Sequence, residues 1–174
     1  ENLTISGNYC YVANYDQGLL ILNVANPVTP TFTGLYNTTG LSREVALSGN
    51  YAYVADDASG LQIINVANPT LPVLAGHYST ASAVRGVSIS GNYCYLAVDT
   101  LGLLVLNITN PTLPSFAGSY PSPDRFYQTL IVGNYCFIAG YYSGVLVLDI
   151  TNPASPVLIG SYDTPGRAWE VSVS

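Results

Sequence analysis

Four aspartates stand where carboxylates could bind a metal ion or act on a sugar. Asp16, Asp56, Asp57 and Asp99 fall in three short polar segments at corresponding places along the chain, and the fourth such segment, residues 140–143, has no acidic residue. Clustered carboxylate oxygens can hold Ca²⁺, and a carboxylate pair can hydrolyse a glycosidic bond. The segments share no ligand spacing, so we interpret these residues as solvated loop carboxylates and predict no metal and no cofactor.

The chain offers little for nucleophilic catalysis, and we predict that it is not an enzyme. His77 is its only histidine and it has no lysine, so a Ser-His-Asp or Cys-His arrangement is not expected. Cys10, Cys94 and Cys136 share one position of a repeat and suggest no zinc spacing. Equivalent strands of packed sheets lie ~10 Å apart, and a disulfide needs Cα atoms within roughly 7 Å. We therefore expect buried, reduced thiols; an intermolecular bridge is the alternative for an odd count.

The low charge argues against nucleic acid and favours the cell exterior. Charged residues make up 8% of the chain, against roughly 25% in a typical soluble domain. The net charge is -6, and the only basic residues are Arg43, Arg85, Arg125 and Arg167. Nucleic-acid binding needs clustered Lys and Arg, and a membrane span needs about 20 apolar residues, so we expect neither. Tyr, Ser, Thr and Asn instead supply the polarity of an extracellular or cell-surface protein. Without Met or a signal peptide, the chain is expected to be a processed or excised segment.

The sequence repeats four times with a period of 42 residues. Units 1–42, 43–84, 85–126 and 127–168 align without a gap. A fixed period near 40 residues is typical of arrays and propellers, so each unit is predicted to be one blade. Ten positions are identical in all units; in the first they are Gly7, Asn8, Tyr9, Ala13, Gly18, Asn26, Pro27, Pro30, Gly34 and Tyr36.

Each unit contains four β-like runs. In the third unit, residues 85–90 alternate apolar and polar side chains, 92–98 follow a Gly-Asn turn, 101–109 are nearly all apolar, and 115–120 form a shorter run. Four antiparallel strands make one propeller blade, and neighbouring blades bury each other's faces. The predicted class is all-β, a β-propeller. A β-sandwich is the alternative, which the gapless period disfavours.

The third run of the fourth unit carries a family resemblance. Residues 145–149 read "VLVLD", residues 7–13 read "GNYCYVA", and an Asn-Pro-x-x-Pro turn follows each third run. These features resemble the LVIVD-repeat propellers, although the family's Asp is Asn23, Asn65 and Asn107 in the other units. The resemblance implies a propeller in a bacterial or archaeal surface or secreted protein. It supplies no catalytic residues.

Residues 169–174 repeat the first strand a fifth time. Val171 and Val173 alternate with serines, as in a half-buried strand. A closed four-blade ring has no place for another inner strand, whose ladder groups would stay unpaired. We predict that residues 169–174 form the first strand of a further blade, so that the chain is part of a larger propeller. Two alternatives remain open: the segment reaches into a neighbouring subunit, or it replaces residues 1–6.

The loops are predicted to divide between two faces. The turn after the first strand and the turn after the third strand hardly vary, so all variable loops fall on the opposite face, called the loop face below. Loops on a rigid scaffold commonly carry binding residues, although these loops could also vary because nothing constrains them. Aromatic, Asp and Arg side chains suit a carbohydrate or protein partner. The predicted binding residues are Tyr15, Asp16, Arg43, Asp57, Arg85, Asp99, Tyr127, Tyr141, Tyr142, Arg167 and Trp169.

Three Asn-x-Thr triplets are candidate glycosylation sites, at Asn2, Asn37 and Asn107. Asn37 lies in a loop between units and is expected to be the most accessible. Asn107 is expected to cap the turn that follows it.

Three functional classes follow, in this order. The first is a surface-exposed interaction propeller. The second is a self-assembling subunit of an extracellular fibre, sheath or surface layer, because the outer strands carry almost no charge to guard their edges and could self-associate there or through the chain ends. The third is an enzyme acting on polysaccharide, which would need carboxylates or a histidine converging at one mouth of the channel.

Overall fold

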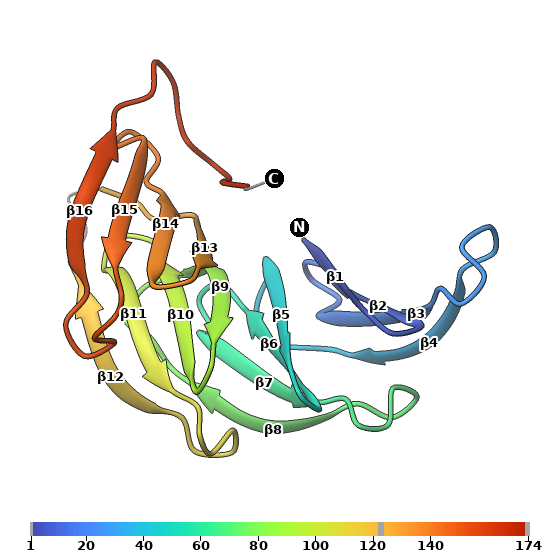
Figure 1. The fold of residues 1–174 in the computed structure, drawn as a ribbon. Helices are drawn as coiled ribbons and strands as arrows, with labels where there is room; N and C mark the ends of the chain where they lie inside the picture. The colour runs from blue at the N-terminus through green and yellow to red at the C-terminus, as the bar shows by residue number, and fades with distance from the viewer. Residues whose placement is uncertain (1, 122–123, 173–174) are drawn as a thin grey trace.

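The computed structural model describes residues 2–121 and 124–172. The described residues form four antiparallel four-stranded sheets and no helix. Figure 1 shows the sheets side by side in an open arc, with the first strand of each towards the centre. Each sheet corresponds to one sequence repeat, which confirms the predicted all-β propeller blades.

Within each blade the strand order follows the chain from the inner strand to the outer one. Blade 1 contains β1 (Leu3–Ser6), β2 (Tyr9–Ala13), β3 (Leu19–Asn23) and β4 (Thr31–Tyr36). Blade 2 contains β5 (Glu44–Ser48), β6 (Tyr51–Ala55), β7 (Leu61–Asn65) and β8 (Val73–Tyr78). Blade 3 contains β9 (Val84–Ser90), β10 (Tyr93–Val98), β11 (Gly102–Asn107) and β12 (Ser115–Tyr120). Blade 4 contains β13 (Gln128–Val132), β14 (Tyr135–Ala139), β15 (Val145–Asp149) and β16 (Val157–Tyr162).

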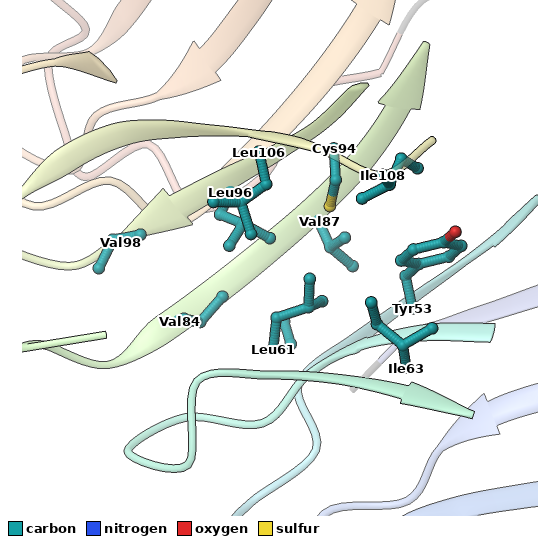
Figure 2. Close-up of a cluster of buried hydrophobic side chains, with 11 residues drawn as sticks. Tyr53, Leu61, Ile63, Val84, Val87, Cys94, Leu96, Val98, Leu106 and Ile108 are labelled. Atoms are coloured by element: carbon teal, nitrogen blue, oxygen red, sulfur yellow. The ribbon is translucent and has the colours of Figure 1, made fainter. Parts of the chain in front are cut away.

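The hydrophobic core is divided among the three interfaces between neighbouring blades. Figure 2 shows the interface of blades 2 and 3, where Tyr53, Leu61 and Ile63 face Leu96 and other side chains of blade 3. A twisted sheet cannot cover both of its own faces, so each blade depends on its neighbour for burial. The arc is therefore held together by contacts that repeat from blade to blade.

In blades 1 to 3, a glycine of the outer strand receives the turn of the next blade. A Cβ at Gly34, Gly76 or Gly118 would lie 2.2, 2.5 or 2.4 Å from the carbonyl oxygen of Pro69, Pro111 or Pro153. Such an approach leaves no space for a side chain. The repeated glycine and the repeated Asn-Pro turn are thus two halves of one contact between blades.

Asparagine side chains hold the turns after the third strands. Asn107 Oδ1 accepts a 2.9 Å hydrogen bond from the Thr109 backbone N–H, which confirms its expected capping role. Asn23, Asn65 and Asp149 make the same bond two residues ahead. Short side chains that bond their own backbone favour turns over ladders. For this reason β11 ends at Asn107. The sequence predicted that this strand would continue to residue 109, so the observed strand is shorter at its end than predicted.

The last described residues do not form the predicted strand. Trp169–Ser172 are in no ladder, and Val173 and Ser174 lie outside the described residues. The segment nevertheless follows the course of an inner strand, because Ala168 forms an antiparallel bridge with Tyr141 just as Val84 does with Asp57. Alternating side chains suit such a strand, but a ladder also needs a second strand beside it.

The cysteines are free and buried, as predicted. Burial raises the pKa of the thiols, that of Cys136 to about 12. His77 is exposed on β8. No helix long and apolar enough to cross a membrane occurs in the described part of the chain.

Candidate binding site at the loop face

Two kinds of loop meet on one side of every blade. The β2–β3 loop is bridged to the connection between blades 1 and 2 by Tyr15 and Ser42. Asp57 with Val84, and Tyr141 with Ala168, make the corresponding bridges further along the arc. The variable loops therefore share one face, where the sequence analysis placed them.

Residues at the start of successive inner strands alternate with residues of these loops in a continuous row of contacts. We call this row the channel-mouth belt. It begins with a cation–π contact between the Arg43 guanidinium and the Tyr15 ring, 4.8 Å from the ring centroid. The belt consists of Tyr15, Arg43, Asp57, Arg85, Asp99, Arg125, Tyr127, Tyr141, Tyr142, Arg167 and Trp169.

One half of the belt is a network of ion pairs. Arg43 donates to Asp57 Oδ2 from Nε (2.9 Å) and Nη2 (2.7 Å). Arg85 lies between two blades, with Nη1 3.5 Å from Asp57 Oδ2 and Nη2 2.9 Å from Asp99 Oδ2. Asp99 Oδ1 accepts no hydrogen bond from the described residues but lies 3.4 Å from Arg125 Nε. Because the arginines and aspartates of this network are paired, they offer hydrogen-bond donors and acceptors to a ligand while the network carries little net charge.

The other half of the belt is aromatic. The rings of Tyr127 and Tyr141 stack with centroids 5.2 Å apart, and Trp169 meets them edge-on at 4.6 and 5.0 Å. Arg167 lies 5.0 Å from the Tyr141 centroid and donates a 2.9 Å hydrogen bond to the Tyr142 hydroxyl. Desolvation by these neighbours, followed by the hydrogen bond with Tyr142, raises the pKa of Tyr141, so its phenol stays neutral.

Three belt residues have a left-handed backbone. Tyr15, Asp57 and Tyr141 have φ angles of 49°, 50° and 54°. Aspartate tolerates this conformation, but for a bulky residue such as Tyr it is unfavourable. Strain of roughly 1–3 kcal/mol per residue persists where the surrounding structure enforces it, and such strain concentrates at functional sites.

A pocket of about 550 Å³ lies beneath the belt. Ligand sites typically have volumes of about 300–1,000 Å³. The pocket is open to solvent and its walls mix charged, amide and aromatic side chains. It is lined by Asn2, Leu3, Arg43, Glu44, Arg85, Tyr127, Gln128, Trp169 and Glu170.

Glu44 is a residue of this pocket that the sequence analysis missed. Its Oε1 accepts hydrogen bonds from Asn2 Nδ2 (2.8 Å) and Gln128 Nε2 (3.1 Å), and its Oε2 accepts one from the Val87 N–H (2.7 Å). Desolvation by burial raises the pKa of Glu44 to about 7 despite these bonds, with a smaller repulsion from Glu170. The equivalent inner-strand position is also polar in three other repeats, where it is Asn2, Gln128 and Glu170. This recurrence of polar residues could have indicated Glu44 from the sequence.

The remaining aspartates have different roles. Asp56, fully buried, accepts hydrogen bonds from Thr38 Oγ1 (2.6 Å), Ser42 Oγ (2.8 Å) and the Gly40 N–H (2.8 Å). It therefore fixes the connection from blade 1 to blade 2, and the prediction of a solvated carboxylate is wrong there. The same prediction is wrong for Asp99, which is buried and forms an ion pair with Arg85. Asp16 is exposed in the β2–β3 loop and makes no belt contact among the described residues. No group of three potential metal ligands occurs within residues 2–121 and 124–172.

The candidate glycosylation sites differ in accessibility. Asn37 is exposed. The Asn2 side-chain nitrogen, to which a glycan would attach, donates to Glu44. The Asn107 side chain caps its turn.

Comparison with known proteins agrees with this architecture. The LVIVD repeat family model matches residues 1–38, 39–80, 81–122 and 129–164. Among solved structures, the computationally designed Ika8 protein superimposes with a TM-score of 0.77 at 10% sequence identity, over 99% of this chain and 52% of that chain. The designed Ika4 protein superimposes with a TM-score of 0.67 at 11% identity, over 85% and 89%. The chain thus spans about half the length of Ika8. No curated protein matches the sequence. The four matched segments cover most of the residues, and the chain belongs to the LVIVD repeat family.

Proposed function

We propose that the protein is a non-enzymatic extracellular or cell-surface scaffold that binds a carbohydrate or a protein at the channel-mouth belt. The belt itself is the observation that carries this proposal. It gathers ten of the eleven residues predicted for binding, together with Arg125, and Tyr15 and Tyr141 keep an unfavourable backbone conformation there. Backbone strain concentrates at functional sites, which supports a binding role for the belt. The cell-exterior location is supported by the low charge and by the accessible Asn37.

The test compares belt variants with a variant of the opposite face. The chain is immobilised and offered a glycan array and a displayed library of random peptides. Binding by any member should weaken about tenfold in Trp169→Ala and Tyr141→Ala, since each change removes a large aromatic contact. Asn68→Ala, in the β7–β8 turn, should bind as the unchanged protein does. Equal loss from both faces, or no binding to either library, would refute the proposal.

Self-assembly is a second candidate, favoured by the outer strands. Phe32 of β4 and Phe116 of β12 are 69% and 58% exposed, and neither strand carries a charged side chain that would guard its edge. Light scattering after size-exclusion chromatography should then show a concentration-dependent oligomer that Phe116→Asp abolishes. A monomer at all concentrations would count against this candidate.

An enzyme acting on polysaccharide is the third candidate. Glu44 and Glu170 line one pocket, as this class requires. Both Glu44 oxygens, however, already accept hydrogen bonds from neighbouring inner strands, which suits a structural role better than proton transfer. Release of reducing ends from a polysaccharide, lost in Glu44→Gln, would establish an enzyme and overturn the scaffold proposal.

A further inference from the structure

The arginines of the pocket beneath the belt are already paired. Arg43 and Arg85 line the pocket together with Glu44 and Glu170, and they form ion pairs with Asp57 and Asp99 in the belt above. The carboxylate of Glu44 is likewise held by three hydrogen bonds. An anionic ligand would therefore find no free positive charge at Arg43 or Arg85 and would lose its hydration on entry.

The same groups suit a ligand made of hydroxyl groups. A hydroxyl both donates and accepts, so it needs donors and acceptors side by side. The guanidinium groups of Arg43 and Arg85 supply donors, and the carboxylate of Glu170 supplies acceptors. Gln128 and Glu44 are fixed by each other and by backbone N–H groups, so this wall of the pocket is rigid before a ligand arrives. Preorganised polar groups reduce the ordering cost of binding.

An aromatic surface stands beside these polar groups. Trp169 lines the pocket, and 53% of its surface is exposed. Its contacts with Tyr127 and Tyr141 are edge-to-face, which holds the indole in place. The C–H faces of a pyranose ring pack on an aromatic ring while its equatorial hydroxyls point to the sides. A protein partner, by contrast, usually covers about 800 Å² on each side and needs no cavity.

From this arrangement we propose that the pocket binds a neutral saccharide, with one sugar ring on Trp169 and its hydroxyls directed to Arg43, Arg85 and Glu170. This inference rests on the proposed function and narrows its ligand to one class. It requires no metal and no chemical step.

Trp169 is the only tryptophan of the chain, so its fluorescence reports on this pocket alone. The protein is titrated to millimolar concentration with neutral oligosaccharides of glucose, galactose, mannose, N-acetylglucosamine and fucose. A saturable change in the Trp169 emission with at least one sugar is expected. Calorimetry should then show affinity lowered about tenfold in Trp169→Ala and largely kept in Trp169→Phe, which retains a ring. His77→Ala, on the exposed outer strand, is the matched control and should bind normally.

The outcomes separate this inference from the broader proposal. If every sugar fails but a peptide or protein binds in a manner that depends on Trp169, the saccharide inference is wrong and the scaffold proposal stands. Saccharide binding that Trp169→Ala leaves unchanged would also overturn the inference, since the sugar would then bind elsewhere. Failure of all ligands would refute both.

Discussion

Glu44 accepts a 2.7 Å hydrogen bond from the backbone N–H of Val87, on the inner strand of the next blade. Gln128 accepts an equivalent hydrogen bond, also of 2.7 Å, from the Val171 N–H. Each of these pairs is separated by 43 residues along the chain. A side chain at one repeated position thus ties its inner strand to the following one. The bond to Val171 also explains how Trp169–Ser172 keep the course of an inner strand without a ladder.

The free energy of unfolding should fall as pH rises through neutrality because of Glu44. The pKa of Glu44 is about 7 in the folded chain, against 4.5 when unperturbed, so the folded state binds the proton more tightly. The resulting stabilisation is complete below pH 4.5 and is lost as pH rises through 7, a difference of about 2 kcal/mol between pH 5 and pH 8. Urea unfolding of the unchanged protein and of Glu44→Gln, each at pH 5 and pH 8, measures this difference in stability. Parallel pH dependence in the two proteins would show that Glu44 is not the titrating group.

The fold could be predicted because the repeat is periodic, but the pairing of the last segment could not. Residues 169–172 have the same alternation as β9, yet only β9 forms a ladder. Alternation reports which side of a strand is buried, whereas a ladder depends on a partner strand. The same limit applies to Asp56, whose loop position suggested solvent but whose buried partners come from the preceding repeat.

The belt could be predicted as a set of residues, but its contacts could not. Arg43 with Asp57, and Arg85 with Asp99, are separated by the same 14 residues. This spacing follows from a first strand and a following loop of constant length. The further contact of Arg85 with Asp57 depends on the angle between blades, which a single repeat does not reveal.

Enlarging the interblade glycines should destabilise the arc, and Gly160 provides the control. A Cβ at Gly76 would meet the Pro111 carbonyl oxygen at 2.5 Å, so Gly76→Ala must push two blades apart. We expect a loss of about 1–3 kcal/mol in the free energy of unfolding. The Cβ of Gly160→Ala meets no atom of the described residues within 4 Å, so this change should alter stability by less than about 0.5 kcal/mol. Chemical denaturation of both variants checks this, and similar losses in the two would contradict the described packing.

All three cysteines should be free thiols that react only after unfolding. Cys10, Cys94 and Cys136 are buried, and burial raises their pKa values, so the reactive thiolate is scarce in the native protein. A thiol reagent should react slowly with the native chain and should titrate all three groups in denaturant without reductant. Finding a single free group in the denatured chain would indicate a disulfide and refute this prediction.

Backbone strain at Tyr141 can be separated from the role of its ring by two substitutions. Tyr141→Ala and Tyr141→Gly both remove the ring contacts with Tyr127 and Trp169, but only glycine adopts a φ of 54° without cost. Tyr141→Gly should therefore be more stable than Tyr141→Ala by about 1 kcal/mol in thermal or urea unfolding. Tyr142 is the matched position, because it is not among the residues with positive φ, and there the glycine variant should be the less stable of the two. If alanine were favoured at both positions, the left-handed conformation at Tyr141 would not be a source of strain. Backbone strain would then no longer support a binding role for the belt.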